Sequence, residues 1–265
     1  MGARSTPTSP SAGAGAGQPA AGTTAPCCWC DDYEKEISVL STKYATSYAA
    51  DGTVHGNYGA SRKFKLYAPV KTGSKITVEI RFLVAPDAGV SAADVTAAKT
   101  KVETGVNTHW NGKFKLEATD LQCPKKTFDI EYKVVWVTSG AHYTLKVHPT
   151  YPREGVSGLV VDVSATTNAW TYAHEFGHCV GLPDEYSYVA ASTETVKYIK
   201  PDGSLDAAIV APYNGKDPSL PDATLMAANG NTVLLKRHAW NVAMETQELL
   251  TAKLGRPIKC DIISP

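Results

Sequence analysis

Residues 174–186 read HEFGHCVGLPDEY, and the interpretation of the whole chain starts from this stretch. His174 and His178 are four residues apart, so on a helix both imidazoles lie on one face, about 5–6 Å apart at Cβ. That separation allows two bonds of about 2.0–2.1 Å to one zinc ion. Glu175 is rotated by about 100° from the first histidine and flanks the ion without binding it. The pattern predicts a zinc site with a carboxylate beside it.

The carboxylate indicates catalysis. Zinc lowers the pKa of a bound water towards about 7, and the resulting hydroxide can attack a polarised carbonyl. Glu175 is placed to take the proton of that water as a general base and to return it to the leaving amine as a general acid. A purely structural zinc site has no need of such a group. The expected reaction is therefore hydrolysis of a peptide bond.

The third ligand is expected just beyond the second histidine. Gly181 permits a sharp turn, and Pro183 prevents the helix from continuing. The chain can then fold back so that Asp184 offers an anionic oxygen, which leaves a fourth position open for water. Glu185 is adjacent and is an alternative third ligand. Two more distant acids are also available, Glu194 and Glu245.

The motif His-Glu-x-x-His-x-x-Gly-x-x-Asp resembles the zinc motif of the metzincin metallopeptidases, with Asp184 where the commonest members have a third histidine. The string Gly-Leu-Pro-Asp-Glu-Tyr is similar to bacterial secreted zincins of the immune-inhibitor-A and IgA-peptidase type. It is also similar to metallopeptidase effector domains attached to bacterial secretion machinery. The strong match covers only residues 174–186. It implies a zincin-like fold, Zn²⁺ as the cofactor and a protein or peptide as the substrate.

Metzincins carry a methionine turn beneath the zinc, and the resemblance assigns this role to Met226, although an ordinary core methionine is the alternative. Some metzincins have a tyrosine two residues after this methionine, where this chain has Ala228. A group that stabilises the transition state must then come from elsewhere. The candidates for it are Tyr186, Tyr213 and His238.

The remaining pattern predicts an α+β order. Ser91 and Asp94 form a capping box, and an apolar stripe then runs to Trp110, which predicts a helix backing the sheet. The active-site helix is expected to be capped by Thr167 or Asn168. A long loop should occupy 182–231 and a final helix about 233–253. Strands are expected at 37–40, 64–70, 76–84, 114–118, 128–137, 143–148 and 158–163. The expectation is a zincin-like, mixed twisted sheet with a backing helix, an active-site helix and a C-terminal helix.

The N-terminal segment has a different composition. Residues 1–26 consist mostly of Ala, Gly, Ser, Thr and Pro, which cannot bury enough apolar area to offset the entropy of ordering. We therefore expect a disordered tail over residues 1–30, which includes a cysteine cluster, followed by one metallopeptidase domain over 31–265.

The chain has six cysteines, three of them crowded into this cluster. One interpretation is one or two disulfides that tie the N-terminal segment and the C-terminus to the core. The other is a thiolate of the cluster that binds and inhibits the catalytic metal. Cys179 points away from the metal and is expected in the core or in a disulfide. The six residues are Cys27, Cys28, Cys30, Cys123, Cys179 and Cys260.

The charge balance and the length of the apolar stretches limit the classes of partner that can be expected. Twenty-six basic and 26 acidic residues cancel, which gives no electrostatic reason to expect nucleic acid or a membrane surface. The longest apolar stretches are strand-sized, so no membrane span is expected. The N-terminus lacks the apolar core of a standard signal peptide. Together with the resemblance, this predicts an exported effector or toxin, with a secretion-machinery component or an immunity or inhibitor protein as a partner.

Two other functions are compatible with the sequence. One is a hydrolase of short peptides such as those of the cell wall, since the width of the cleft decides substrate size. The other is a secreted binding or toxin module with a mainly structural zinc site.

Overall fold

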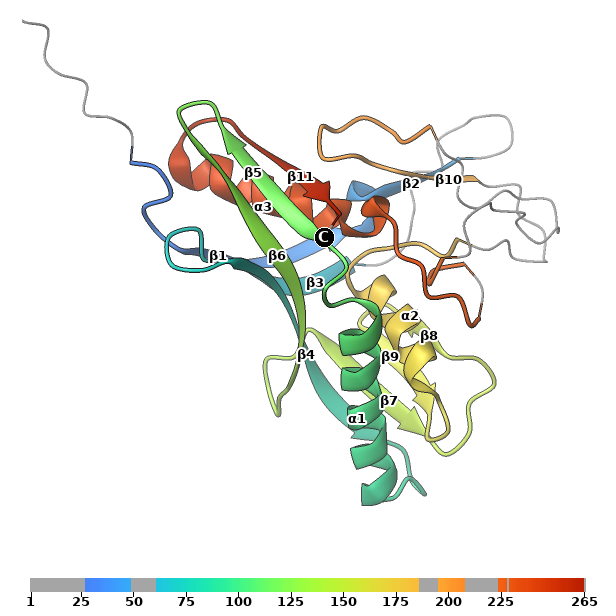
Figure 1. Cartoon of the computed structure of the whole chain (residues 1–265). Helices are drawn as coiled ribbons and strands as arrows, with labels where there is room; N and C mark the ends of the chain where they lie inside the picture. Colours follow the sequence, from blue (N-terminus) through green and yellow to red (C-terminus); the bar gives the residue numbers. More distant parts are fainter. Residues whose placement is uncertain (1–26, 49–60, 186–194, 208–223, 228, 265) are drawn as a thin grey trace, which may run out of the picture.

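A mixed β-sheet forms the frame of the molecule (Figure 1). A computed structural model describes residues 27–48, 61–185, 195–207, 224–227 and 229–264. The strands of the main sheet are β1 (Tyr33–Leu40), β3 (Ser61–Ala68), β4 (Lys75–Pro86), β5 (Lys115–Asp120), β6 (Cys123–Trp136), β7 (Tyr143–His148), β8 (Gly155–Ser157), β9 (Val160–Ser164) and β11 (Ile258–Ile263). A separate antiparallel pair consists of β2 (Ala45–Tyr48) and β10 (Thr195–Tyr198).

The sheet follows the order β11-β5-β6-β4-β7-β9-β8, with β3 paired to β4 and β1 paired to β3. Strand β4 pairs in parallel with β6 and with β7, and β7 pairs in parallel with β9. The other pairs are antiparallel. Along β4 the side chains of Ile76, Val78 and Ile80 are fully buried, which explains its place in the interior of the sheet. The expected α+β class with a mixed sheet is confirmed.

Three helices accompany the sheet in the described residues: α1 (Ala92–His109), α2 (Ala169–Cys179) and α3 (Trp240–Leu254). Helices α1 and α2 lie side by side, and α3 packs against β11 and β1 (Figure 1). The capping box of α1 is confirmed: the Asp94 N–H donates to Ser91 Oγ at 3.1 Å, and the Ser91 N–H donates to the Asp94 carboxylate at 3.0 Å. None of the helices in the described ranges is long and apolar enough to cross a membrane.

The C-terminal part differs from the sequence prediction. Helix α3 begins at Trp240, after a short 3₁₀ helix over Lys236–Ala239, and not near residue 233. The backbone of Val233 instead pairs with a distant segment, because its carbonyl accepts the N–H of Leu225 at 2.9 Å. Gly255 ends α3, with a φ of +65° that suits glycine. The chain then forms β11, which the sequence prediction missed.

Two other strand predictions were incomplete. The strand expected at 158–163 is β9, which begins only at Val160 because Gly158 turns the chain before it with a φ of +58°; β8, on the other side of this turn, was missed. Strand β10 lies inside the stretch expected to be a loop, where it pairs with β2. Residues 1–26 of the expected tail lie outside the described residues.

The contact between α1 and α2 gives a test of the packing. A Cβ added to Gly105 would overlap the backbone carbonyl oxygen of Ala169, so the two helices meet backbone to backbone. Gly105→Ala should therefore lower the free energy of unfolding by about 1–3 kcal/mol, although alanine favours helices. Thermal or denaturant unfolding measures the change.

Gly155→Ala is the matched control, because a Cβ at Gly155 meets no described atom within 4 Å. We expect its free energy of unfolding to stay within about 0.5 kcal/mol of the parent protein. Equal stabilities for the two variants would contradict this packing of α1 on α2.

Candidate metal centre

The two histidines of the motif lie on one face of α2. Asn168 caps this helix and accepts the N–H of Thr171 at 2.9 Å, so that the helix begins at Ala169, ahead of the first histidine. The imidazole rings of His174 and His178 lie edge to face with their centroids 4.9 Å apart. The prediction that both rings face a common point is confirmed.

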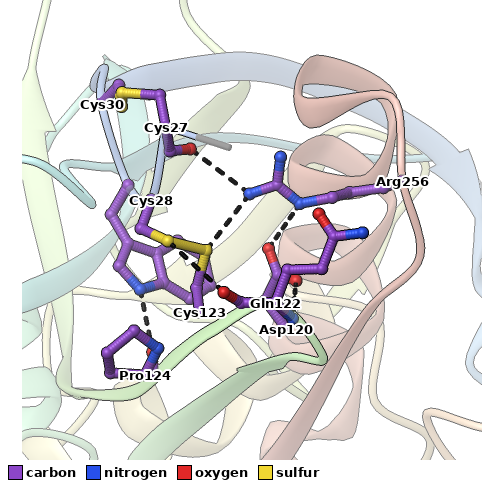
Figure 2. The surroundings of a disulfide bond; sticks show 9 residues. Cys27, Cys28, Cys30, Asp120, Gln122, Cys123, Pro124 and Arg256 are labelled. Atoms are coloured by element: carbon purple, nitrogen blue, oxygen red, sulfur yellow. Dashed lines mark hydrogen bonds and ion pairs between the residues drawn. A yellow bond between two sulfur atoms is a disulfide. The ribbon is translucent and has the colours of Figure 1, made fainter. Parts of the chain in front are cut away.

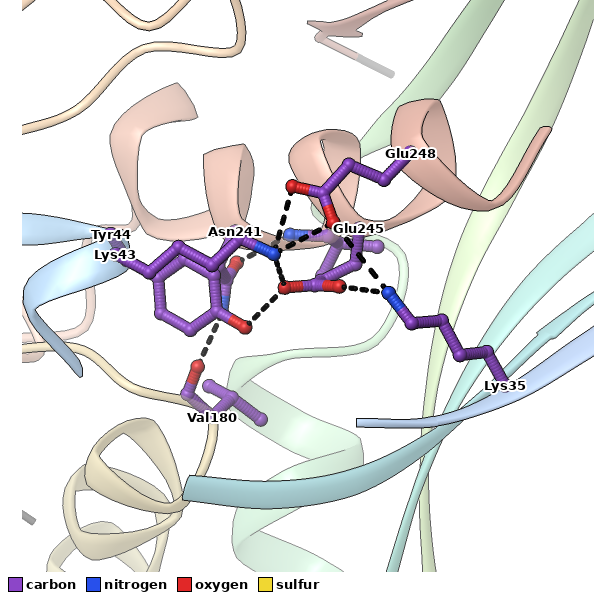
Figure 3. A network of polar contacts seen from close by, with 8 residues as sticks. Lys35, Lys43, Tyr44, Val180, Asn241, Glu245 and Glu248 are labelled. Atoms are coloured by element: carbon purple, nitrogen blue, oxygen red, sulfur yellow. Dashed lines mark hydrogen bonds and ion pairs between the residues drawn. The ribbon is translucent and has the colours of Figure 1, made fainter. Parts of the chain in front are cut away.

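A tight turn follows α2 and reverses the chain. Gly181 has a φ of +100°, and a Cβ at this position would overlap the ring of Tyr44. The Leu182 N–H donates to the Gly177 carbonyl at 3.0 Å, which closes the end of the helix. From the other side, Asn241 Nδ2 donates to the Val180 carbonyl at 2.6 Å (Figure 3). These contacts bring the next acidic residue back onto the histidine face.

Asp184 completes a set of three metal-binding side chains. Its Oδ1 lies 3.1 Å from His174 Nε2 and 3.2 Å from His178 Nε2, and the three donor atoms lie within 4.8 Å of one another. His174 and Asp184 are buried, and His178 is nearly so. The cluster can hold a metal ion, as the sequence predicted.

Backbone carbonyls orient both imidazoles for this task. His174 Nδ1 donates to the Leu225 carbonyl and His178 Nδ1 donates to the Leu182 carbonyl, each at 2.9 Å. Since a carbonyl can only accept, each Nδ1 carries a proton, and Nε2 is the nitrogen that faces the centre and can bind a metal. This is the arrangement that histidine ligands of zinc need.

The charges around the centre favour a cation. Burial opposes the protonation of His178, but the Asp184 carboxylate outweighs it and raises the pKa of His178 to about 9. Burial likewise opposes ionisation of Asp184, yet the two histidines hold its pKa well below its usual range. Two nitrogen donors and one carboxylate are a donor set typical of catalytic zinc. The residues present therefore fit a bound divalent metal ion, and zinc is one that this donor set suits.

Glu175 is buried beside this cluster, and one of its carboxylate oxygens makes no hydrogen bond to the described residues. The residue is only 5% exposed, and its Oε2 has no hydrogen-bond partner among the described residues. Burial raises the pKa of Glu175 above its usual value, although His178 and His174 lower it in part. A buried, unpaired carboxylate oxygen is costly unless a ligand or water satisfies it. The arrangement suits a proton acceptor for a water at the metal.

Met226 packs against the helix that carries the two histidines. The residue is fully buried, and a Cβ added to Gly177, between the two histidines, would overlap its Sδ. The preceding residue, Leu225, supplies the carbonyl that orients His174. Met226 thus belongs to the segment that packs against α2 and holds His174.

Other candidates for the third ligand lie away from the centre. The Glu185 carboxylate is turned towards Arg237 and His238 and does not join the donor set. Glu245 is fully buried on α3, where it pairs with Lys35, Lys43 and the hydroxyl of Tyr44 (Figure 3). Both alternatives are therefore wrong as ligands. Glu194 lies outside the described residues.

Of the three predicted transition-state donors, the structure describes only His238. His238 is fully buried, its Nδ1 accepts the N–H of Leu235, and its Nε2 lies 2.9 Å from the carboxylate of Glu185. With both ring nitrogens engaged, His238 has no free N–H for a substrate, and its prediction as a donor is wrong. The other two candidates, Tyr186 and Tyr213, lie outside the described residues.

The cysteine cluster is a disulfide anchor. Cys28 is bonded to Cys123 at the start of β6, and Cys27 is bonded to Cys30 (Figure 2). Arg256 joins this region by donating to Asp120 and to the Cys27 carbonyl. The predicted disulfide to the N-terminal segment is confirmed, whereas an inhibitory thiolate on the metal is wrong because all three clustered sulfurs are paired.

Two corrections follow for the other cysteines and for the tail. Cys179 and Cys260 are free and buried, so no disulfide ties the C-terminus. Residues 27–30 belong with the folded part of the chain and not with the expected tail, because the side chain of Cys28 is disulfide-bonded to Cys123 at the start of β6.

The sequence prediction missed the groups that hold the ligands in place. The Leu225 carbonyl and the side chains of Thr224 and Arg237 carry no motif of their own, and each lies far along the chain from the residue it contacts. The only local signal was the acidic neighbour of Asp184, Glu185.

Comparison of this chain with known protein families, curated proteins and solved structures found no match.

Proposed function

We propose that this chain is a zinc-dependent endopeptidase of zincin-like fold. The observation that carries the proposal is the buried Oε2 of Glu175, which lacks a partner among the described residues and lies beside a donor set of two imidazoles and one carboxylate. A site that only binds metal gains nothing from an unsatisfied carboxylate. A hydrolytic site needs a proton acceptor at this place.

The roles divide among four side chains. His174, His178 and Asp184 would hold the ion through Nε2, Nε2 and a carboxylate oxygen. Bound zinc supplies Lewis acidity and makes a coordinated water more acidic. Glu175 would accept the proton of such a water at Oε2, and its raised pKa suits it to hold a proton and to pass it to the leaving amine.

The same geometry bears on the two alternative functions, the binding module and the hydrolase of short peptides. A binding or toxin module with a structural zinc site would leave Glu175 without a role. Hydrolysis of short cell-wall peptides uses the same chemistry and differs only in the size of the substrate. A hydrolase is therefore preferred over the binding module, and the test below separates an endopeptidase from a hydrolase of short peptides.

We also propose that the protein acts outside the reducing interior of the cell, as an exported bacterial effector or toxin. The disulfides Cys28–Cys123 and Cys27–Cys30 support an oxidising destination, because such bonds rarely persist in the cytosol. The effector role rests on the resemblance of residues 174–186.

The test is chelator-sensitive proteolysis. The purified protein is incubated with a denatured protein mixture and, separately, with cell-wall peptides, and new N-termini are identified by mass spectrometry. We expect cleavage of the denatured proteins that a chelator abolishes and added zinc restores. Cleavage of the cell-wall peptides alone would replace the endopeptidase with the peptide hydrolase. No chelator-sensitive cleavage of either substrate would contradict a peptidase.

A further inference from the structure

The segment that carries Asp184 has no helix or strand to hold it. Residues 182–185 follow the turn at Gly181 without regular structure. A metal ligand on such a segment needs to be fixed by its neighbours, because a displacement of about 1 Å can cost two orders of magnitude in function. The adjacent residue, Glu185, makes contacts that can fix it.

Glu185 is anchored on three sides. Its side chain is fully buried, and Arg237 donates to both carboxylate oxygens, from Nε at 2.9 Å and from Nη2 at 3.0 Å. Thr224 Oγ1 donates to Oε2 at 2.5 Å. His238 donates from Nε2 to Oε1 at 2.9 Å, since its Nδ1 already accepts a backbone N–H. A two-point arginine contact of this kind fixes the orientation of a carboxylate as well as its position.

The anchor also reaches the histidine side of the centre. The segment of Thr224, Leu225 and Met226 binds the Glu185 side chain through the threonine hydroxyl and the Glu185 N–H through the Met226 carbonyl, at 2.8 Å. Between these two contacts, the Leu225 carbonyl accepts from Nδ1 of His174. One short segment therefore holds the first ligand and the residue next to the third ligand.

We infer that Glu185 is a positioning residue for the metal centre. It does not bind the ion, but its contacts with Arg237 and Thr224 hold the neighbouring Asp184 in place beside His174. This inference rests on the proposed zinc site. It explains why a second acid directly follows the ligand in the motif, and why that acid is buried away from the donor atoms.

The test compares Glu185→Gln with Asp120→Asn. Glutamine keeps the size of the side chain but removes the negative charge that pairs with Arg237. Asp120→Asn is the matched control, because Asp120 is another buried carboxylate paired with an arginine, Arg256, at the distant β5–β6 end of the sheet (Figure 2). Zinc affinity is measured by competition with a chromophoric chelator, and the visible spectrum is recorded with cobalt in place of zinc.

Glu185→Gln should weaken zinc binding by about 10- to 100-fold and change the cobalt spectrum, as expected when a group that orients a ligand is lost. Asp120→Asn should keep the parent affinity within about twofold and the parent spectrum, although it loses a comparable ion pair. Parent affinity and an unchanged cobalt spectrum in Glu185→Gln, or equal losses of affinity in both variants, would overturn the inference.

Thr224→Val covers the case in which Glu185→Gln does not fold. It removes one hydrogen bond to Glu185, keeps the charge and should weaken zinc by about fivefold. Unchanged affinity in this variant would overturn the inference on its own. The parent protein is titrated first: if it binds zinc but cleaves nothing, the peptidase proposal fails while the positioning role is still decided by affinity. If the parent binds no zinc, both fail.

Discussion

Glu175→Gln is expected to keep its zinc and to lose activity by a factor of about 10² to 10⁴ in kcat, the usual contribution of a general acid–base group. Glutamine has the same shape and can occupy the same buried position, but its amide cannot accept the proton of the attacking water. The three donors His174, His178 and Asp184 are unchanged, so metal binding should persist. Metal analysis of the purified variant and initial rates on a cleavable peptide measure the two quantities.

Stability provides the internal control for this variant. A buried carboxylate oxygen without a partner costs more than a neutral amide in the same place, so Glu175→Gln should unfold at the same temperature as the parent or at a higher one. A loss of activity accompanied by unfolding would therefore point to a defect other than proton transfer. A variant with full zinc and full activity would remove Glu175 from the reaction.

Asp184→Ala is expected to lose zinc. Its carboxylate lies within 3.2 Å of both imidazole Nε2 atoms and is the only negative donor of the set. Loss of a group that merely orients a ligand weakens metal binding by about 10- to 100-fold, so loss of the ligand itself should exceed that range. Zinc content after dialysis and the dissociation constant from chelator competition give the result.

Asp87→Ala is the matched control, because Asp87 also pairs with a histidine, at 2.6 Å from Nδ1 of His148, but outside the metal centre. It should retain a full complement of zinc. Full zinc in Asp184→Ala would show that Asp184 is not a ligand and would reopen the assignment of the third position.

The local parts of this molecule could be predicted from sequence because their causes lie within a few residues. The spacing of His174 and His178 fixes their shared face on any helix. The capping box of Ser91 and Asp94 is complete within one turn, and the structure has both of its hydrogen bonds. The turn at Gly181 follows from backbone preferences, with a φ of +100° that suits glycine.

The remaining parts depend on contacts between distant segments. Nothing in the sequence around Glu185 distinguishes it from a ligand, and its true partner, Arg237, comes from just before α3. Glu245 could be considered a ligand only while its pairing with Lys35 and Lys43 was unknown. The late start of α3 has the same cause, because Val233 is held by its backbone contact to Leu225.

The most direct test of the metal centre is a crystal structure of the zinc-loaded protein with anomalous diffraction recorded on both sides of the zinc absorption edge. We expect one zinc peak per chain, bonded to Nε2 of His174, Nε2 of His178 and a carboxylate oxygen of Asp184. A water on the open side of the zinc should lie within hydrogen-bonding reach of Glu175 Oε2. A zinc peak elsewhere, no peak at all, or a zinc bonded to Glu185 in place of Asp184 would contradict this account of the centre.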